Sequence, residues 1–394
     1  MTRSIVLAGA CRTPIGKMGG ALSGIPAADL GALVIEEALH RAGLPKDCVD
    51  TVIMGCVLQG AQGQNVARQA AIKAGLPVEI PAQTLNMVCG SGLQSVQLAA
   101  LMVGSGQADV VVAGGMENMS AAPFALNKAR FGYRLNDSTL IDTLVRDALW
   151  DAFGNIHMGI TAENIAARYG ITREEQDAFA ARSQNKCQRA RAQGAFREEI
   201  VPVPVVRKKE RLLVSDDEAP RDNVTVESLA PLRPAFKPDG TVTAGNASGI
   251  NDGAAAVVVM SAGAAARFCT SPMAYWVAGS AAGVDPAYMG TGPIAATRRL
   301  LQQTGKSMQD FDLIEANEAF AAQCLAVGKA LDWDDAIVNV NGGAIALGHP
   351  VGASGCRILV TLLHAMRQQN ARLGLATLCV GGGMGVAAMV ENAG

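Results

Sequence analysis

The sequence has little charge, few aromatic side chains and no long apolar segment. Charged residues make up 17% of its 394 residues and aromatic residues 4%, while 49% are hydrophobic. This balance excludes an intrinsically disordered chain, which combines low hydrophobicity with high charge. The formal net charge of −2 argues against a nucleic-acid-binding protein, because such binding depends on clustered positive charge. The best apolar run, Ala254 to Met260, has seven residues, whereas a membrane span needs about 20, so we expect no membrane segment.

The nine cysteines are scattered, and no two of them form a C-x-x-C pair. Their odd number and wide spacing argue against a disulfide framework or a zinc ribbon, and they favour a reducing compartment. The start of the chain, MTRSIVLAGACRTPIGK, has no small-residue cleavage site and is expected to form a first strand rather than a signal peptide. We therefore expect a cytoplasmic protein.

Strand-like apolar runs alternate with helical patterns along most of the chain. The predicted strands are IVLAG near the N-terminus, 51–55, 109–115, 254–260 and 311–317, and the predicted helices are 27–42, 65–74, and segments starting near Cys89, after Pro293 and after Asn317. This alternation is typical of βαβ units and of a largely parallel, buried sheet. The length allows two or three domains.

The pattern changes between about residues 120 and 245. A helix opens here with TREEQDAFAARSQ, where Thr172 and Glu175 have the spacing of a capping box, and a charged stretch covers 207–223. This region is interpreted as an insertion of loops and helices between two α/β halves.

Two segments, 88–119 and 348–385, share one order of features: a glycine-bearing helix start, an apolar helical stripe, a strand and then GGM. The likeness indicates an internal duplication. It places Cys89 and His349 at equivalent helix N-termini, one in each half, where both can face one site. A helix N-terminus favours the thiolate form of a cysteine, so Cys89, in NMVCGSG, is a candidate nucleophile.

Each candidate also has a purely structural interpretation. A free cysteine is commonly a buried core residue, His349 in GHP could cap a turn, and Asn317 in NEAFA could be a plain helix N-cap. Cys379 precedes VGGGMG, whose spacing nominally fits a dinucleotide-binding fingerprint. We reject that fingerprint because too few residues follow for its helix and acidic residue. The glycines are instead expected to let backbone N–H groups approach a substrate.

Seven segments taken together carry a resemblance to a known family. In chain order they are NMVCGSG, GGMENMS, HMGITAENIA, TAGNASGINDGAAA, NEAFA, GGAIALGHPVGASG and CVGGGMG. Over residues 1 to 394 the chain resembles the thiolase family, and most closely its biosynthetic acetyl-CoA acetyltransferases.

The resemblance implies an α/β thiolase fold, with two similar βαβαβαββ halves packed as αβαβα layers and an inserted loop domain. The N-terminal half would cover 1–120 and be completed by about 246–272, the loop domain would cover 121–245, and the C-terminal half 273–394. It also implies a homotetramer, with the segment near 125–145 resembling the family's tetramerisation loop. The implied reaction is the reversible Claisen condensation of two acetyl-CoA into acetoacetyl-CoA and CoA, through an acetyl-cysteine intermediate, without a metal or redox cofactor.

Catalytic roles follow from the same resemblance. Cys89 would accept the acetyl group, His349 would take the Cys89 proton, and Cys379 would move the proton of the second acetyl-CoA methyl group. The enolate oxygen would meet His349 and a water held by Asn317, and the N–H groups of Cys89 and Gly381 would receive the acyl oxygen.

The implied CoA and substrate site is mostly small or apolar, as expected around a thin pantetheine arm. It comprises Leu149, His157, Met158, Arg221, Ser228, Ala244, Ser248, Met289, Ala319 and Phe320. Arg221 would face the nucleotide end, and Met289 would restrict the acyl pocket to short chains.

Two other functions stay open at this point. One is a degradative 3-ketoacyl-CoA thiolase of broader chain length, and the other is a non-catalytic acyl or lipid carrier of the same fold. The presence of Cys89, His349, Cys379 and Asn317 counts against the carrier. Decarboxylating ketosynthases use Cys-His-His, so Cys379 disfavours that class.

Overall fold

The computed structural model describes residues 3–207 and 210–394, so residues 208 and 209 of the charged stretch 207–223 lie outside the described residues. One path of paired strands runs through the molecule. In spatial order it comprises β14 (Leu313–Ala316), β15 (Leu373–Val380), β16 (Met384–Asn392), β13 (Ala274–Gly283), β1 (Ile5–Arg12), β12 (Asn251–Ser261), β5 (Val110–Asn118), β3 (Thr51–Gly55) and β4 (Ala82–Leu85), with β2 (Gly16–Lys17) paired to β12.

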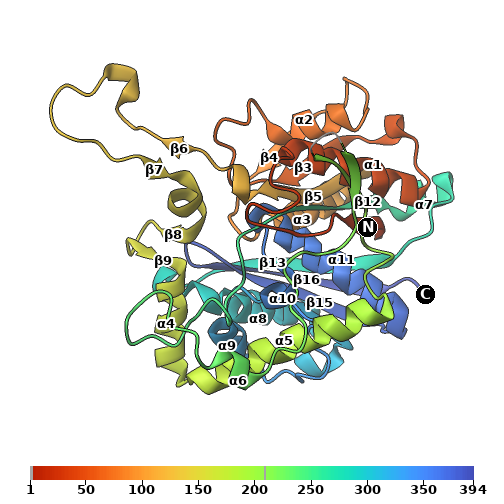
Figure 1. The fold of residues 1–394 in the computed structure, drawn as a ribbon. Helices are drawn as coiled ribbons and strands as arrows, with labels where there is room; N and C mark the ends of the chain where they lie inside the picture. The colour runs from red at the N-terminus through yellow and green to blue at the C-terminus, as the bar shows by residue number, and fades with distance from the viewer. Residues whose placement is uncertain (1–2, 208–209) are drawn as a thin grey trace.

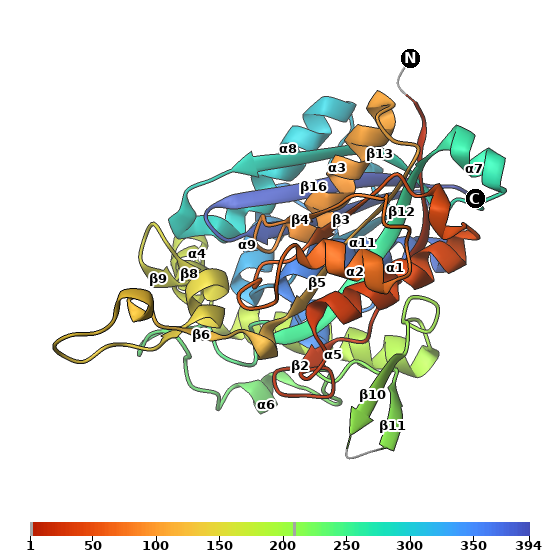
Figure 2. The same cartoon turned by 90° about the horizontal axis from the view of Figure 1, so that it is seen from above.

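This path divides into two half-sheets at β1 and β13. Only Val6 with Tyr275 and Leu7 with Ala274 pair across that junction among the described residues, whereas β12 and β5 pair along the length of Asp252 to Met260. The two half-sheets face each other across a shared core that contains residues from both. The structure therefore has two sheet layers, one from each half of the chain (Figures 1 and 2).

Helices form the three remaining layers. The helices α1 (Ala27–Ala42) and α2 (Val66–Lys73) cover the outer face of the first half-sheet, and α8 (Gly292–Thr304) and α9 (Ala321–Leu331) lie on the other outer side. Between the sheets lie α3 (Ser91–Ser105) and α11 (Val351–Gln369), which pack against each other. The order of layers is αβαβα, as expected.

The two central helices approach unusually closely because glycines stand at their contact. A Cβ atom added to Gly92 would lie 2.7 Å from the backbone nitrogen of Cys356, and one added to Gly355 would lie 2.4 Å from that of Leu93. Real Cβ atoms do not come so close to backbone atoms, so only glycine fits at both positions. The first turns of α3 and α11 are thereby held side by side.

The predicted strands and helices are found within a few residues of their expected bounds, but the expectation of a largely parallel sheet is wrong. Parallel pairing joins β14 to β15, and β3 to β4 and β5, while the other described pairings of the large sheet are antiparallel. A continuous apolar run indicates only that both faces of a strand are buried. Here the helix layers bury both faces of the antiparallel strands too, so the run does not indicate the strand direction.

The chain between β5 and β12 forms small hairpins and helices. They are β6 (Phe124–Ala125), β7 (Ile141–Asp142), β8 (Trp150–Asp151), β9 (Ile156–His157), α4 (Met158–Tyr169), α5 (Arg173–Gln193), β10 (Val203–Arg207), β11 (Glu210–Val214) and α6 (Val226–Leu229), and outside this region lie α7 (Ala262–Phe268) and α10 (Ala344–Leu347). The capping box predicted for Thr172 and Glu175 is confirmed at the start of α5. Within 3–207 and 210–394 no helix is both long and apolar enough to cross a membrane.

A buried ion network fixes this middle region to the first strand. Arg12, at the end of β1, is fully buried and contacts Glu199 at 2.5 Å and Asp217 at 2.7 and 3.0 Å. Backbone bonds from Arg12 to Glu199 and from Val201 to Arg12 run beside it. Both carboxylates are buried as well, so loss of the guanidinium would leave two buried charges without their partner.

We expect Arg12→Ala to lower the free energy of unfolding by about 3–5 kcal/mol, because removing one partner of a buried ion pair strands the other. Chemical denaturation followed by circular dichroism measures this. The matched control is Arg3→Ala, since Arg3 pairs with Asp109 at 2.7 Å with both side chains more than two-fifths exposed. That variant should change stability by less than about 1 kcal/mol, and equal losses in the two variants would contradict the interpretation.

Candidate active site

Cys89 and His349 occupy the same position relative to the two central helices. Each lies one residue before a helix N-cap, Gly90 for α3 and Pro350 for α11. In both cases the residue before has a positive φ, 45° at Val88 and 111° at Gly348. The prediction that Cys89 and His349 stand at equivalent helix N-termini is confirmed, and the contact between the first turns brings both ends together.

Cys89 is partly exposed as a residue and packs against an apolar wall. That wall contains Val57 and Leu58, which follow β3, and Val351 in the first turn of α11. The backbone N–H groups of Gly381 and of Cys89 itself act on the sulfur and lower its pKa, but desolvation is stronger and raises the pKa to about 11. The N–H groups at the helix start thus favour the thiolate as expected, but burial outweighs them and keeps Cys89 in the thiol form near neutral pH.

The hydrogen bonds of His349 assign its tautomer. Its Nδ1 lies 2.5 Å from the Ser354 hydroxyl, and that hydroxyl donates its single proton to the Pro350 carbonyl at 2.8 Å. With the hydroxyl proton assigned to that carbonyl, Nδ1 carries the ring proton and Nε2 has a free lone pair. Nε2 is buried and has no hydrogen-bond partner among the described residues, and burial lowers the pKa of His349 to about 3. The imidazole is thus neutral, with its basic nitrogen available.

Cys379 is the second thiol of the site. It lies near the end of β15 and is fully buried, and burial raises its pKa. The chain just after it passes the residue before Cys89, since a Cβ added to Gly381 would lie 3.2 Å from Val88. After it, Gly382 and Gly383 turn the chain with φ of 81° and 84°, and the strand β16 follows. Because no helix follows these glycines, rejection of the dinucleotide-binding fingerprint is confirmed.

Asn317 follows β14 and is held by charged groups behind it. Its Oδ1 accepts a 3.5 Å hydrogen bond from Arg357, which lies 3.7 Å from Glu315, and burial raises the pKa of Glu315 to about 8. The amide nitrogen of Asn317 is buried and has no partner within the described parts of the chain. The alternative that Asn317 is a plain N-cap is wrong, because the N-cap of α9 is Phe320.

Five of the expected site residues gather in one apolar cluster. Its members are Met158, Met289, Ala319, Phe320 and Cys379, with Ala162, Val242 and Ala247. Gly381 lies beside it, since an added Cβ there would be 3.7 Å from the Met158 sulfur. His157 caps α4 through a 3.0 Å bond from the Gly159 N–H and stacks on Phe236 at 4.8 Å. The buried thiol of Cys379 is thus enclosed by apolar side chains.

The other expected binding residues lie around this cluster. Arg221 and Ala244 line one groove with Ala247, and the Ser248 N–H donates to the Ala319 carbonyl at 3.0 Å. Ser228 is exposed on α6 next to Leu229 of the same groove. Leu149 packs against the apolar wall beside Cys89. Ala247 belongs both to this groove and to the apolar cluster that contains Cys379, so the two adjoin.

Sequence reasoning missed residues that support the reactive groups from behind. Asn251 accepts a 2.9 Å bond from the His349 N–H and donates to the Gly16 carbonyl, and Ser354 fixes the imidazole. The sequence did contain a signal for Glu315: a carboxylate inside an apolar strand is expected to have a buried partner of opposite charge. Asn251 and Ser354 lie within quoted motifs, but their bonding partners could not be read from spacing alone.

Comparisons with known proteins show what the whole chain is similar to. Residues 5–263 match the family model "Thiolase, N-terminal domain" and residues 270–392 match "Thiolase, C-terminal domain". An acetyl-CoA acetyltransferase of Pseudomonas aeruginosa is 58% identical over 98% of both chains, and one of Cupriavidus necator is 56% identical over 98% of this chain and 99% of the relative. The crystal structure of the Bacillus anthracis acetyl-CoA acetyltransferase superposes with a TM-score of 0.97 at 45% identity and covers 99% of each chain. The chain belongs to the thiolase family.

Proposed function

We propose that the protein is an acetyl-CoA C-acetyltransferase, which condenses two acetyl-CoA reversibly into acetoacetyl-CoA and CoA. The observation that carries this proposal is geometric: Cys89 and His349 precede two helices whose first turns are in contact, and the chain after Cys379 passes beside Val88. The names of these two relatives support the same activity.

The first half-reaction transfers the acetyl group to Cys89. His349 Nε2 takes the Cys89 proton as the sulfur attacks the thioester carbonyl. Both groups are neutral beforehand, so the thiol still has a proton to give and the imidazole can accept it. The N–H groups of Cys89 and Gly381, which act on the sulfur in the free site, are placed to receive the developing oxyanion. The C–S bond to CoA then breaks, and the CoA sulfur takes a proton from Cys379.

The second half-reaction forms the carbon–carbon bond. Cys379 starts as a thiol, since burial raises its pKa, and becomes a base only after it has given its proton to the leaving CoA. Its thiolate then removes a methyl proton from the second acetyl-CoA. His349, now protonated, and the amide of Asn317 stabilise the enolate oxygen. The enolate carbon attacks acetyl-Cys89, and the released Cys89 sulfur recovers its proton from His349, so every proton is accounted for.

We propose that the acyl pocket accepts only short chains and that Arg221 binds the nucleotide end of CoA. Met158, Met289 and Phe320 fill the space beside Cys379 and are all at least nine-tenths buried. Arg221 is exposed at the outer end of the groove, where a phosphate could be reached. The chemistry needs neither a metal nor a redox cofactor, because the thiols and the imidazole supply every proton transfer.

A homotetramer in the cytoplasm is part of the proposal. The arm that carries β6 and β7 projects from the molecule (Figure 1), and it exposes the large apolar residues Phe124, Phe131, Leu135 and Leu140. Exposed apolar side chains in such a group favour contact with another chain. All nine cysteines are free thiols, which suits a reducing compartment.

We expect acetyl-CoA to add one acetyl group per chain, at Cys89, as detected by peptide mass spectrometry. Cys89→Ser should lower kcat by roughly 10³-fold or more, because a hydroxyl ionises far less readily than a thiol. The remaining eight cysteines serve as internal controls. Stable acetylation of another cysteine with Cys89 unmodified would reject the assignment.

Cys379→Ala should separate the two half-reactions. Cys89 should still be acetylated, because CoA can leave as a thiolate and take its proton from water. Condensation and exchange of the acetyl-CoA methyl protons with solvent deuterium should fall by about 10²- to 10⁴-fold, the usual contribution of a general base. NMR of recovered acetyl-CoA measures the exchange. Normal exchange in this variant would mean that a different base removes the proton.

Met289→Ala should widen the acyl pocket without touching the reactive groups. The ratio of kcat/KM for longer 3-ketoacyl-CoA to that for acetoacetyl-CoA should then rise by roughly 10- to 200-fold at most, because a methylene in an apolar pocket contributes ~1–3 kcal/mol. Thiolysis assays at three chain lengths give the ratio. An unchanged ratio would remove Met289 as the determinant, and high wild-type activity on long chains would favour the broader 3-ketoacyl-CoA thiolase.

A further inference from the structure

Two buried carboxylates hold the segment that carries His349, one on each side of the histidine. The Ile345 N–H donates to Glu318 at 3.2 Å, four residues before the histidine, and the Gly352 N–H donates to Glu117 at 2.9 Å, three residues after it. Glu117 is fully buried and Glu318 is 2% exposed. Neither carboxylate takes part in the proton transfers proposed above.

Glu117 joins the start of α11 to the apolar wall beside Cys89. Besides Gly352, it accepts the N–H groups of Val57 at 3.0 Å and Leu58 at 3.1 Å. Val57 and Leu58 belong to the wall against which Cys89 packs. The position of Gly352 in the first turn of α11 also gives the carboxylate a favourable interaction with the helix dipole. Glu117 thus sets the His349 segment against the surroundings of the nucleophile.

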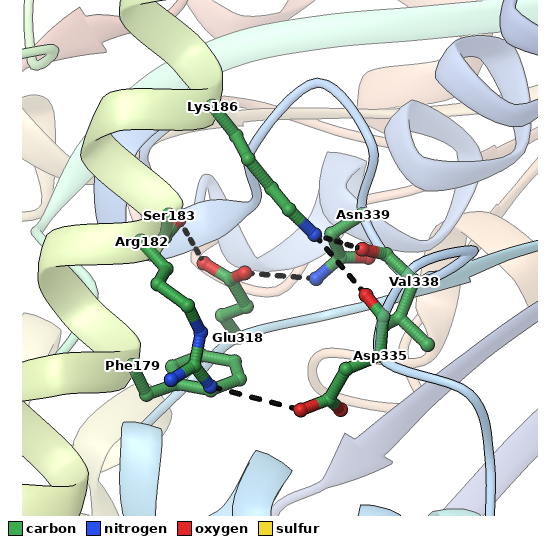
Figure 3. Close-up of a pocket in the computed structure, with 8 residues that line it drawn as sticks. All are labelled: Phe179, Arg182, Ser183, Lys186, Glu318, Asp335, Val338 and Asn339. Atoms are coloured by element: carbon green, nitrogen blue, oxygen red, sulfur yellow. Dashed lines mark hydrogen bonds and ion pairs between the residues drawn. The ribbon is translucent and has the colours of Figure 1, made fainter.

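Glu318 joins the same segment to Asn317, its neighbour in the chain. Figure 3 shows the Ser183 hydroxyl and the Asn339 amide pointing at its carboxylate, at 2.6 and 2.9 Å. The Ser183 oxygen in turn accepts the Gly343 N–H at 3.1 Å, at the start of the His349 segment. A Cβ added to Gly343 would lie 2.3 Å from Glu318 Cδ, so the backbone passes directly over the carboxylate.

The two cations that line this pocket are directed elsewhere. Lys186 donates to the backbone carbonyls of Val338 at 2.7 Å and Asp335 at 3.3 Å, and Arg182 lies 3.8 Å from the Asp335 carboxylate (Figure 3). The described hydrogen bonds to Glu318 therefore come from neutral donors on three segments. Its role in the structure is to hold these segments together.

Each carboxylate accepts hydrogen bonds at both of its oxygens. An amide side chain cannot reproduce this, because its nitrogen donates and does not accept. In a glutamine at either position, the NH2 group would face an N–H or O–H that donates toward it. Burial raises the pKa of Glu117 to about 7 and raises that of Glu318, so holding these groups has a cost that the hydrogen bonds offset.

We propose that Glu117 and Glu318 are positioning residues for His349, Glu117 aligning it with Cys89 and Glu318 aligning it with Asn317. This inference rests on the proposed function, in which His349 acts with Cys89 in acetyl transfer and with Asn317 in enolate formation. The two carboxylates therefore serve different half-reactions through one histidine.

Glu117→Gln and Glu318→Gln test this division. Quenched-flow mass spectrometry gives the rate of Cys89 acetylation, and deuterium exchange into the acetyl-CoA methyl group, measured by NMR, gives the rate of enolate formation. Glu117→Gln should slow acetylation by up to about 100-fold, as a misplacement near 1 Å does. Glu318→Gln should leave acetylation within about threefold of wild type and slow methyl exchange by up to about 100-fold, with KM for acetyl-CoA changed less than kcat.

Asp312→Asn is the matched control. Asp312 also accepts two backbone N–H groups, those of Arg372 and Leu373 at 2.8 Å each, but at the opposite end of β14 from Asn317. This variant should keep both rates. If a glutamine variant does not fold, Glu117→Asp or Glu318→Asp replaces it, and should show a smaller loss confined to the same half-reaction.

Equal losses in both half-reactions for Glu318→Gln, or unchanged rates in both glutamine variants, would overturn the proposal. Wild-type protein that is not acetylated at Cys89 would overturn the proposed function itself. The wild-type measurement therefore distinguishes failure of the proposed function from failure of the positioning roles alone.

Discussion

The contact between α3 and α11 is the constraint on which the rest of the structure depends. Each helix comes from a different half of the chain, and each places its reactive residue one position before its N-cap. Glycines at Gly92 and Gly355 allow the first turns to meet at backbone distance. With a larger residue at either position, the helices would separate, and Cys89 and His349 would move apart with them. The duplicated architecture thereby produces one site from two equivalent helix starts.

Burial, rather than the helix dipole, sets the resting charges of this site. Desolvation raises the pKa of Cys89 to about 11 and lowers that of His349 to about 3, which favours a neutral thiol and a neutral imidazole. Charge then develops only when a substrate carbonyl can share it. This order suits an enzyme with two thiols, because a permanent thiolate at Cys89 would oppose a second thiolate at Cys379.

Much of the fold could be predicted from the sequence because local patterns dictate it. The helix over 27–42 and the strand over 51–55 have the bounds that their apolar periodicity predicts. Sheet direction could not be predicted, since antiparallel pairing of β12 with β1 and β5 joins segments more than 100 residues apart. The pKa of Cys89 was missed for the same reason, because desolvation comes from distant segments that the motif NMVCGSG does not contain.

The unpaired polar atoms of the structure show where its reactivity is concentrated. Twelve buried side-chain nitrogen and oxygen atoms lack a hydrogen-bond partner among the described residues, and six of them belong to Glu315, Asn317, His349 and Arg357. Such atoms are costly in a folded protein and are normally satisfied. In the Arg12 network, by contrast, the guanidinium and both carboxylates bond to one another. At His349 and Asn317 the described parts of the chain therefore leave a free ring nitrogen and a free amide N–H, which the proposed reaction uses.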